Sequence, residues 1–106
     1  MTDNIKKKIL ESASQRILFL PHAINQINRV DRMISPNEVR HVILNGEIIE
    51  DYCDDPRGHS CLMFDFVTNR PIHIVCAPKE GYLAIITAYI PEASKWTPDF
   101  KRRLKP

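Results

Sequence analysis

The sequence predicts an α+β domain in which N-terminal helices pack on one face of an antiparallel sheet of at least four strands. The first observation behind this prediction is a change of pattern at Gly46: apolar residues recur at helical spacing before it and alternate after it. The second is that turn residues separate the later strands at short intervals, which favours hairpins between antiparallel neighbours. With 106 residues, the chain is expected to form a single domain over residues 1–106.

The first half of the chain carries the helical patterns. One helix is expected over residues 3–14, where apolar residues recur one turn apart. A short strand is expected within residues 15–20, because QRILFL is apolar but too short for a helix. A second helix, over residues 22–32, follows Pro21, a residue suited to the first helical turn. Its expected apolar stripe consists of Ala23, Ile27, Val30 and Ile34.

A third helix, over residues 36–45, has the clearest local signals. Ser35 and Glu38 occupy the two positions of a capping box, with Pro36 at the first helical position. Gly46 is expected to end this helix in the left-handed conformation, which glycine adopts without strain. The helix is therefore expected to stop where the alternating pattern begins.

Four strands are expected after the helices, over residues 47–52, 61–67, 71–77 and 82–90. In the third strand Ile72 and Ile74 share one face, so His73 points to the other. In the fourth, strict alternation separates two groups of side chains: Tyr82, Ala84, Ile86, Ala88 and Ile90 against Leu83, Ile85, Thr87 and Tyr89. If the helices cover the face with Ile72 and Ile86, His73 and Tyr89 project together from the other face.

Charge is nearly balanced over the whole chain but uneven along it. Lys and Arg total 15 and Asp and Glu total 13, a net charge of +2 that does not by itself indicate a nucleic-acid partner. Residues 47–55 hold five carboxylates and no basic residue, whereas residues 95–106 carry a net charge of +4. We expect the acidic stretch to face solvent or a basic partner, and the basic stretch to be a mobile tail.

No cofactor, metal site or membrane segment is indicated. Cys53, Cys61 and Cys76 form no CxxC pair, so we expect reduced thiols and no structural zinc site. Three glycines are too few for a glycine-rich phosphate loop. The N-terminus lacks the apolar stretch of a signal peptide, and no apolar run approaches the roughly 20 residues of a membrane helix. We therefore expect a cytoplasmic protein.

Short blocks of sequence occur in a characteristic order between about His22 and Trp96. They are Asn45-Gly46-Glu47, Glu50-Asp51-Tyr52, Asp55-Pro56-Arg57-Gly58, Arg70-Pro71-Ile72-His73 and Thr87-Ala88-Tyr89. The His22-Ala23 pair, with Arg32 after it, adds to this pattern. In this combination the blocks resemble the bacterial family called domain of unknown function 4258.

The resemblance carries further implications. The family is distantly similar to RelE- and BrnT-type toxins, which are small α+β domains of toxin–antitoxin operons that cleave RNA. The resemblance therefore implies a RelE-like fold and RNA or the ribosome as a partner. It also implies a small zinc-finger-type antitoxin protein, similar to YgiT, as a second partner.

Metal-independent RNA cleavage requires a base, an acid, and cations that stabilise the phosphoryl oxygens. The candidate catalytic residues are His73, Tyr89 and His22, because imidazole and phenol groups can transfer the protons. The candidate phosphate- or RNA-binding residues are Arg57, Arg70, Arg32 and Lys95. Each candidate has a structural alternative, namely packing, capping, a turn or a local ion pair. Trp96 is expected to close the core rather than stack on a base.

These observations favour a toxin-like RNA-cleaving or RNA-binding domain that a partner antitoxin neutralises. The alternative is a non-catalytic protein-interaction or regulatory module, and an enzyme acting on a small molecule is a third reading.

Overall fold

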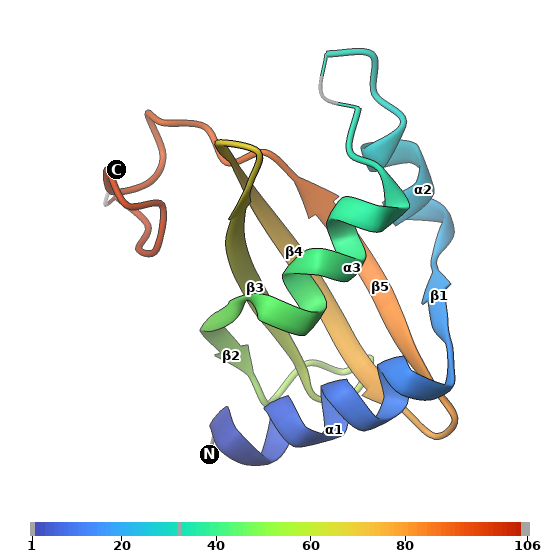
Figure 1. Ribbon diagram of the computed structural model, residues 1–106. Coiled ribbons are helices and arrows are strands. Elements are labelled where there is room, and N and C mark those ends of the chain that lie inside the picture. The colour runs from blue at the N-terminus through green and yellow to red at the C-terminus, as the bar shows by residue number, and fades with distance from the viewer. Residues whose placement is uncertain (1, 32, 105–106) are drawn as a thin grey trace.

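The computed structural model describes residues 2–31 and 33–104, and these residues form three helices and a five-stranded sheet in two layers (Figure 1). The elements are α1 (Thr2–Gln15), β1 (Ile17–Phe19), α2 (Pro21–Ile27), α3 (Pro36–Asn45), β2 (Glu47–Tyr52), β3 (Ser60–Val67), β4 (Arg70–Lys79) and β5 (Tyr82–Tyr89). The α+β prediction is confirmed. Within the described ranges, no helix is both long enough and apolar enough to cross a lipid bilayer.

The sheet is mixed, with the strand order β1-β5-β4-β3-β2. Strands β2 to β5 pair antiparallel, as expected for at least four strands. The short β1 adds a parallel edge by pairing with residues 83–85 of β5. A parallel pair needs a long connection, and here α2, α3 and three strands separate the two partners in sequence.

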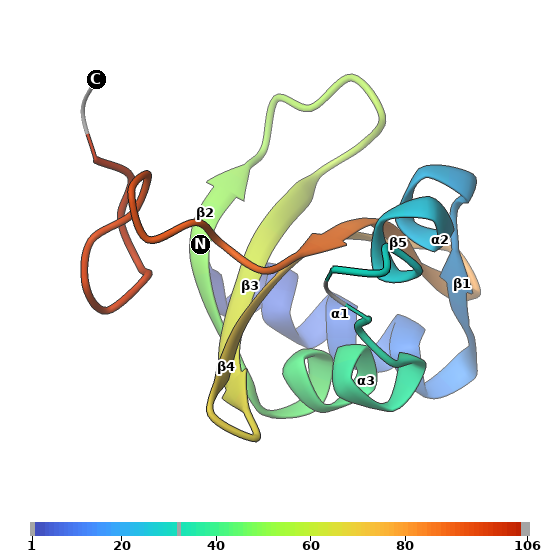
Figure 2. The same ribbon diagram turned by 90° about the horizontal axis from the view of Figure 1, so that it is seen from above.

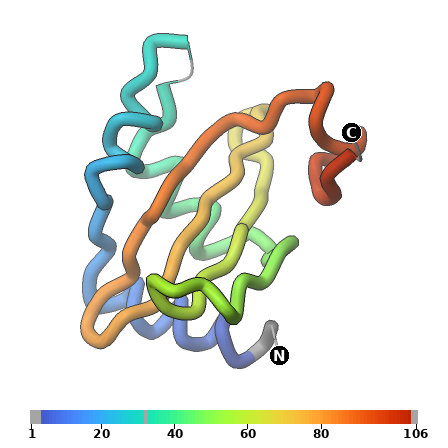
Figure 3. The backbone as a smooth tube through the Cα atoms, turned by 180° about the vertical axis from the view of Figure 1, so that it is seen from behind, coloured from blue at the N-terminus to red at the C-terminus, as the bar shows by residue number. Residues whose placement is uncertain are grey.

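The helices cover one face of the sheet, and the C-terminal part of the chain lies on the side away from them (Figure 2). The helix face carries the main core, in which Ile9 and Ile43 pack with Met63 and Ile74. We call the opposite face of β2–β5 the open face; Figure 3 views the molecule from that side. Among the described residues, residues 91–104 cover part of this open face.

The second helix is shorter than expected: it ends at Ile27 instead of continuing to residue 32. Ile27 and Ile34 are buried, but Val30 is 93% exposed and does not belong to the stripe. The backbone N–H of Ile34 donates to the carbonyl of Ile27 at 3.0 Å, and Met33 adopts a φ of 47°. The chain therefore turns after α2 and returns Ile34 to the core through a loop, which helical spacing alone does not distinguish from a longer helix.

The capping box of α3 is confirmed. Ser35 Oγ accepts from the backbone N–H of Glu38 at 3.1 Å, and the Glu38 carboxylate accepts from the N–H of Ser35 at 2.9 Å. Arg70 of β4 donates to both oxygens of that carboxylate, at 2.8 and 2.9 Å, so the cap also ties α3 to the sheet. The expectation that Gly46 adopts the left-handed conformation was wrong, because its φ is −79°. Glycine is required there for another reason: a Cβ would lie 2.6 Å from the carbonyl oxygen of Val42.

Substitution of Ser35 by alanine tests this cap. Ser35→Ala is expected to lower the free energy of unfolding by about 1 kcal/mol, because the Glu38 N–H loses its acceptor. Asn37→Ala, an exposed position in the same turn, serves as the matched control and should stay within about 0.5 kcal/mol of the unmodified protein. Urea unfolding at pH 7 measures both, and equal losses would contradict the cap.

Candidate functional site

The open face is organised in rows of directly paired residues. One row crosses four strands through Glu47, Phe64, His73 and Tyr89. The next row on this face contains Glu50, Leu62, Val75 and Thr87. Paired residues point to the same side of a sheet, so His73 and Tyr89 share the open face, as expected. The acidic edge of β2 lies at the other end of the same row.

A β-bulge in β2 brings two carboxylates to this face. Ile48 pairs with Met63 and Glu50 pairs with Leu62, so Ile49 is an extra residue in its strand. Glu47 and Glu50 are three positions apart, and without the bulge they would point to opposite faces. The bulge therefore places both carboxylates on the open face.

A second bulge, in β5, changes the expected alternation. Val75 pairs with Thr87 and Cys76 pairs with Ile85, so Ile86 is the extra residue. Leu83 and Ile85 belong to the core on the helix face, together with Ala88. The expectation that Leu83 and Ile85 share a face with Tyr89 was therefore wrong, since the bulge reverses the alternation at Ile86.

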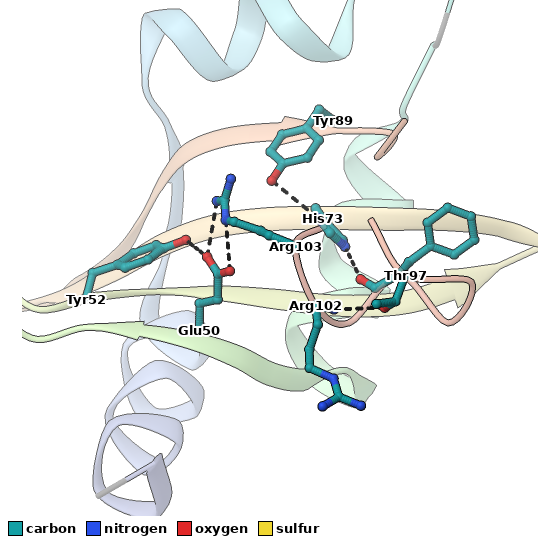
Figure 4. Close-up of polar contacts among 8 residues, drawn as sticks. Glu50, Tyr52, His73, Tyr89, Thr97, Arg102 and Arg103 are labelled. Carbon is teal, nitrogen blue, oxygen red and sulfur yellow. Dashed lines mark hydrogen bonds and ion pairs between the residues drawn. The ribbon is translucent and has the colours of Figure 1, made fainter. Parts of the chain in front are cut away.

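His73 is fully buried on the open face, between β5 and the chain that follows it (Figure 4). Its Nε2 lies 2.8 Å from the carbonyl oxygen of Phe100, and its Nδ1 lies 3.3 Å from the hydroxyl of Tyr89. A carbonyl oxygen only accepts, so Nε2 carries the proton and Nδ1 accepts from the phenol. The Trp96 ring packs nearly perpendicular to the imidazole, with ring centroids 4.4 Å apart.

The surroundings of His73 keep its imidazole neutral. Burial lowers the pKa of His73 from 6.5 to about 4, because an imidazolium would lose its hydration at this position. The Phe100 carbonyl and the Glu50 carboxylate oppose this shift, whereas the Arg103 guanidinium adds to it. Burial also raises the pKa of Tyr89, so its phenol keeps its proton at neutral pH.

A second polar cluster lies beside His73, and sequence reasoning missed it (Figure 4). Arg103 donates to both carboxylate oxygens of Glu50, at 2.9 and 3.1 Å, and the Tyr52 hydroxyl donates to the same carboxylate. The Arg103 guanidinium also lies over the Trp96 ring, 4.8 Å from its centroid. Burial raises the pKa of Glu50, but the hydrogen bonds from Arg103 and Tyr52 outweigh burial and hold this pKa below its usual value. Burial raises the pKa of Tyr52 to about 12, and the Glu50 carboxylate adds to this shift.

Residues 95–104, which we call the C-terminal segment, fold onto the open face. Lys101 Nζ lies 2.8 Å from a carboxylate oxygen of Glu47, in addition to the Arg103–Glu50 pair. The acidic stretch, expected to meet solvent or a basic partner, thus contacts the basic end of its own chain. That basic end, expected to be a mobile tail, contacts the sheet through its described residues. Trp96 is 5% exposed, so the expectation that it closes a core is confirmed.

A shallow pocket of about 220 Å³ opens next to this closure. It is lined by Tyr89, Ile90, Glu92, Lys95, Trp96 and Arg103. Two of the lining residues are cations, and Lys95 Nζ lies 3.6 Å from the exposed carboxylate of Glu92. The pocket therefore combines a phenol and two cations with the Glu92 carboxylate, and a bound anion would replace Glu92 and Glu50 as the partner of the cations. His73 does not line it and reaches it through the Tyr89 hydroxyl.

Two of the arginines predicted to bind phosphate lie away from His73. Arg70 belongs to the helix face, where it is paired with Glu38. Arg57 lies in the β2–β3 loop, where the Asp55 carboxylate accepts two hydrogen bonds from its guanidinium, at 2.9 and 3.1 Å. The Arg57 carbonyl accepts from the ammonium of Lys79, a residue six positions beyond His73 along β4, roughly 20 Å away. The structure therefore brings neither arginine to His73, and Arg103 lies there instead.

The remaining candidates fall into three situations. His22 is exposed in the first turn of α2, outside the rows of the open face. Lys95 lines the pocket described above. Arg32 lies outside the described residues. The one signal that could have indicated Arg103 was the opposite charge of residues 47–55 and 95–106, which does not specify which side chains pair.

The cysteines and acidic residues do not converge on a metal. Among the described residues, no three His, Cys, Asp or Glu side chains gather as metal ligands. Cys61 and Cys76 are buried register partners with sulfurs 4.0 Å apart, and Cys53 is exposed. All three are free thiols.

Fold and site together define a small α+β domain whose polar sheet face is closed by its own C-terminal segment. The family model described as Domain of unknown function (DUF4258) matches residues 19–90, more than half of the chain. The chain therefore belongs to this family. No curated protein and no solved structure matches it significantly. The matched range includes Glu50, His73 and Tyr89 and ends before the C-terminal segment.

The shifted pKa of His73 predicts a pH dependence of stability. Unfolding returns the pKa from about 4 to 6.5, so the unfolded chain binds an extra proton between these values. The contribution of the neutral His73 imidazole to the free energy of unfolding is complete above pH 6.5 and is lost as the pH falls toward 4. Between pH 7.5 and 4.5 the unmodified protein should lose about 2 kcal/mol more than His73→Gln, whose side chain does not titrate.

Urea unfolding of both proteins at the two pH values measures this difference. The carboxylates are common to both proteins, so their contribution largely cancels. Parallel pH dependences would show that His73 is not held neutral.

Proposed function

We propose that this chain is a metal-independent, toxin-like domain that binds and cleaves RNA and is neutralised by a partner protein. The observation that carries the proposal is the pocket in which the Tyr89 phenol, hydrogen-bonded to His73, lies beside Lys95 and Arg103. The sequence blocks resemble the DUF4258 family, and the distant similarity of that family to RelE- and BrnT-type toxins supports the same reading. A small zinc-finger-type protein is the partner that this resemblance favours.

The chemistry needs a path for the proton of the attacking 2′-hydroxyl. In the proposed reaction the phenol oxygen of Tyr89 accepts that proton while its own proton moves to Nδ1 of His73. The 2′-oxygen then attacks phosphorus, the P–O5′ bond breaks, and the leaving oxygen takes a proton from the Lys95 ammonium. Arg103 stabilises the negative charge on the phosphoryl oxygens. Tyr89 and Lys95 contact the substrate, whereas His73 acts through Tyr89.

Removal of the Tyr89 hydroxyl tests this assignment. Tyr89→Phe keeps the ring but breaks the relay, so RNA cleavage should fall by about 100-fold, the lower end of general acid–base effects. Tyr82→Phe is the matched control, because Tyr82 lies at the opposite end of β5, paired with Lys79. Induction of each protein in a host, followed by growth and by the length of cellular RNA, gives the readout.

The unmodified protein and Tyr82→Phe should arrest growth and Tyr89→Phe should not. Arrest by a folded Tyr89→Phe protein would reject the relay. Binding of RNA, measured separately, should weaken steeply with salt because cations carry it.

One observation favours a second candidate, a non-catalytic interaction module. His73 is fully buried and neutral, as a structural histidine would be. In that case induction leaves growth and RNA unchanged. A stable complex with the protein encoded by the neighbouring gene would then form equally well with Tyr89→Phe.

A further inference from the structure

An exposed aromatic ring lies on the open face, two positions along β3 from the row that contains His73. Phe66 is 48% exposed, whereas Phe64, which belongs to that row, is 3% exposed. Residues two apart on a strand point to the same side of the sheet. The rings of Phe64 and Phe66 meet edge to face, with centroids 5.1 Å apart. The buried ring therefore supports the exposed one, which presents an apolar surface to solvent.

A second ring extends this surface from the C-terminal segment. The Phe100 ring meets Phe66 edge to face, with centroids 6.2 Å apart, while the Phe100 carbonyl accepts from His73. Phe100 makes both contacts with a φ of 61°, a left-handed conformation that is unfavourable for a bulky residue. Such a conformation persists only where surrounding contacts hold it in place. We call the rings of Phe66 and Phe100 the aromatic platform.

The turn that carries Phe100 is held by hydrogen bonds. The backbone N–H of Phe100 donates to the carbonyl of Thr97 at 2.8 Å. The Asp99 carboxylate accepts from the Thr97 hydroxyl and from a backbone N–H of the same turn, so this carboxylate is engaged locally. Arg102 is exposed, and its side chain points away from Glu50 (Figure 4). An exposed cation therefore follows the platform ring of Phe100 two residues later.

The platform lies on the same face of the sheet as the residues of the proposed reaction. Phe66 pairs with Pro71, two positions before His73 in β4, and His73 pairs with Tyr89 in β5. Two residues along a strand and two strands across place the Cα atoms of Phe66 and Tyr89 roughly 12 Å apart. The C-terminal segment covers His73 between them. A single RNA strand that crosses this segment reaches both positions, because single-strand sites hold about 4–16 nucleotides.

We propose that the aromatic platform binds a base of single-stranded RNA by stacking, while a phosphate of the same strand occupies the pocket beside Tyr89. This assignment rests on the proposed function, and it narrows the substrate from RNA in general to unpaired RNA. Every base has a flat surface that stacks on an aromatic ring, whichever the sequence. Only an unpaired base can turn that surface outward, because the bases of a duplex stack on one another.

Substitutions of Phe66 separate stacking from simple apolar contact. Phe66→Leu keeps an apolar side chain but removes the ring, so affinity for single-stranded RNA should fall by about fivefold, the lower end of the effect of losing a stacking residue. Phe66→Tyr keeps the ring and should bind as the unmodified protein does. Leu44→Ala is the matched control, because Leu44 is 52% exposed but lies on α3. It should leave the affinity unchanged.

The probe is a labelled 2′-O-methyl oligouridylate, whose binding at low salt is followed by fluorescence anisotropy. It cannot be cleaved in the proposed reaction, because its 2′-oxygens are blocked. Inorganic polyphosphate is the base-free comparison, and Phe66→Leu should bind it as tightly as the unmodified protein does. Unchanged affinity of folded Phe66→Leu for the oligouridylate, or an equal loss for both probes, would overturn the platform. Circular dichroism establishes that each variant is folded.

The unmodified protein gives an independent measurement, for use if a variant fails to fold. The oligouridylate should bind more tightly alone than when it is annealed to its complement, since annealing hides the faces of its bases. Equal or tighter binding of the duplex would overturn the platform.

A cleavage assay with RNA that keeps its 2′-hydroxyls separates the platform from the proposed function. If Phe66→Leu weakens binding but the unmodified protein cleaves no RNA, the platform stands and the catalytic part of the proposed function fails. If RNA is cleaved and Phe66→Leu binds it with unchanged affinity, the platform alone is rejected. If neither the oligouridylate nor polyphosphate binds, RNA binding is rejected and the platform with it.

Discussion

The one-residue bulge at Ile49 is the constraint on which the open face depends. A regular strand would send Glu47 and Glu50 to opposite sides of the sheet, and one carboxylate would meet the apolar core under α3. With the bulge, Ile48 still packs against that core while both carboxylates reach the other face. The ion pairs to Lys101 and Arg103 follow from this placement. The same segment places Trp96 against His73 and the Phe100 carbonyl on the His73 ring nitrogen.

The bulge at Ile86 has the complementary effect in β5. It allows Leu83 and Ile85 to fill the helix-face core, and it still lets Tyr89 meet His73 in the row that begins at Glu47. The alternation in β5 looks continuous in the sequence, but its odd-numbered residues point to the helix face before Ile86 and to the open face after it. Bulges of this kind commonly redirect side chains near functional sites, which agrees with the polar row that these two bulges create.

The two faces of the sheet are stabilised by different forces. The helix face depends on buried aliphatic side chains, whose contribution to stability does not fall with salt. The C-terminal closure combines one buried indole with the ion pairs of Lys101 and Arg103, whose attraction is weakened by salt. His73 lies at the boundary between these regions, since its backbone belongs to the sheet and its side chain is covered by the segment. Its neutral state therefore depends on the C-terminal segment as well as on the sheet.

The sequence by itself determined the elements whose signals are local. The capping box of Ser35 and Glu38, the change of period at Gly46, and the alternation around His73 each act within a few residues, and each was found where expected. It also determined that His73 and Tyr89 share a face. Only the tertiary structure decided the end of α2, the bulges at Ile49 and Ile86, and the partner of the acidic stretch. These depend on contacts between residues far apart in sequence: Arg103 meets Glu50 across 53 positions, and charge patterns indicate that such segments attract without fixing which atoms pair.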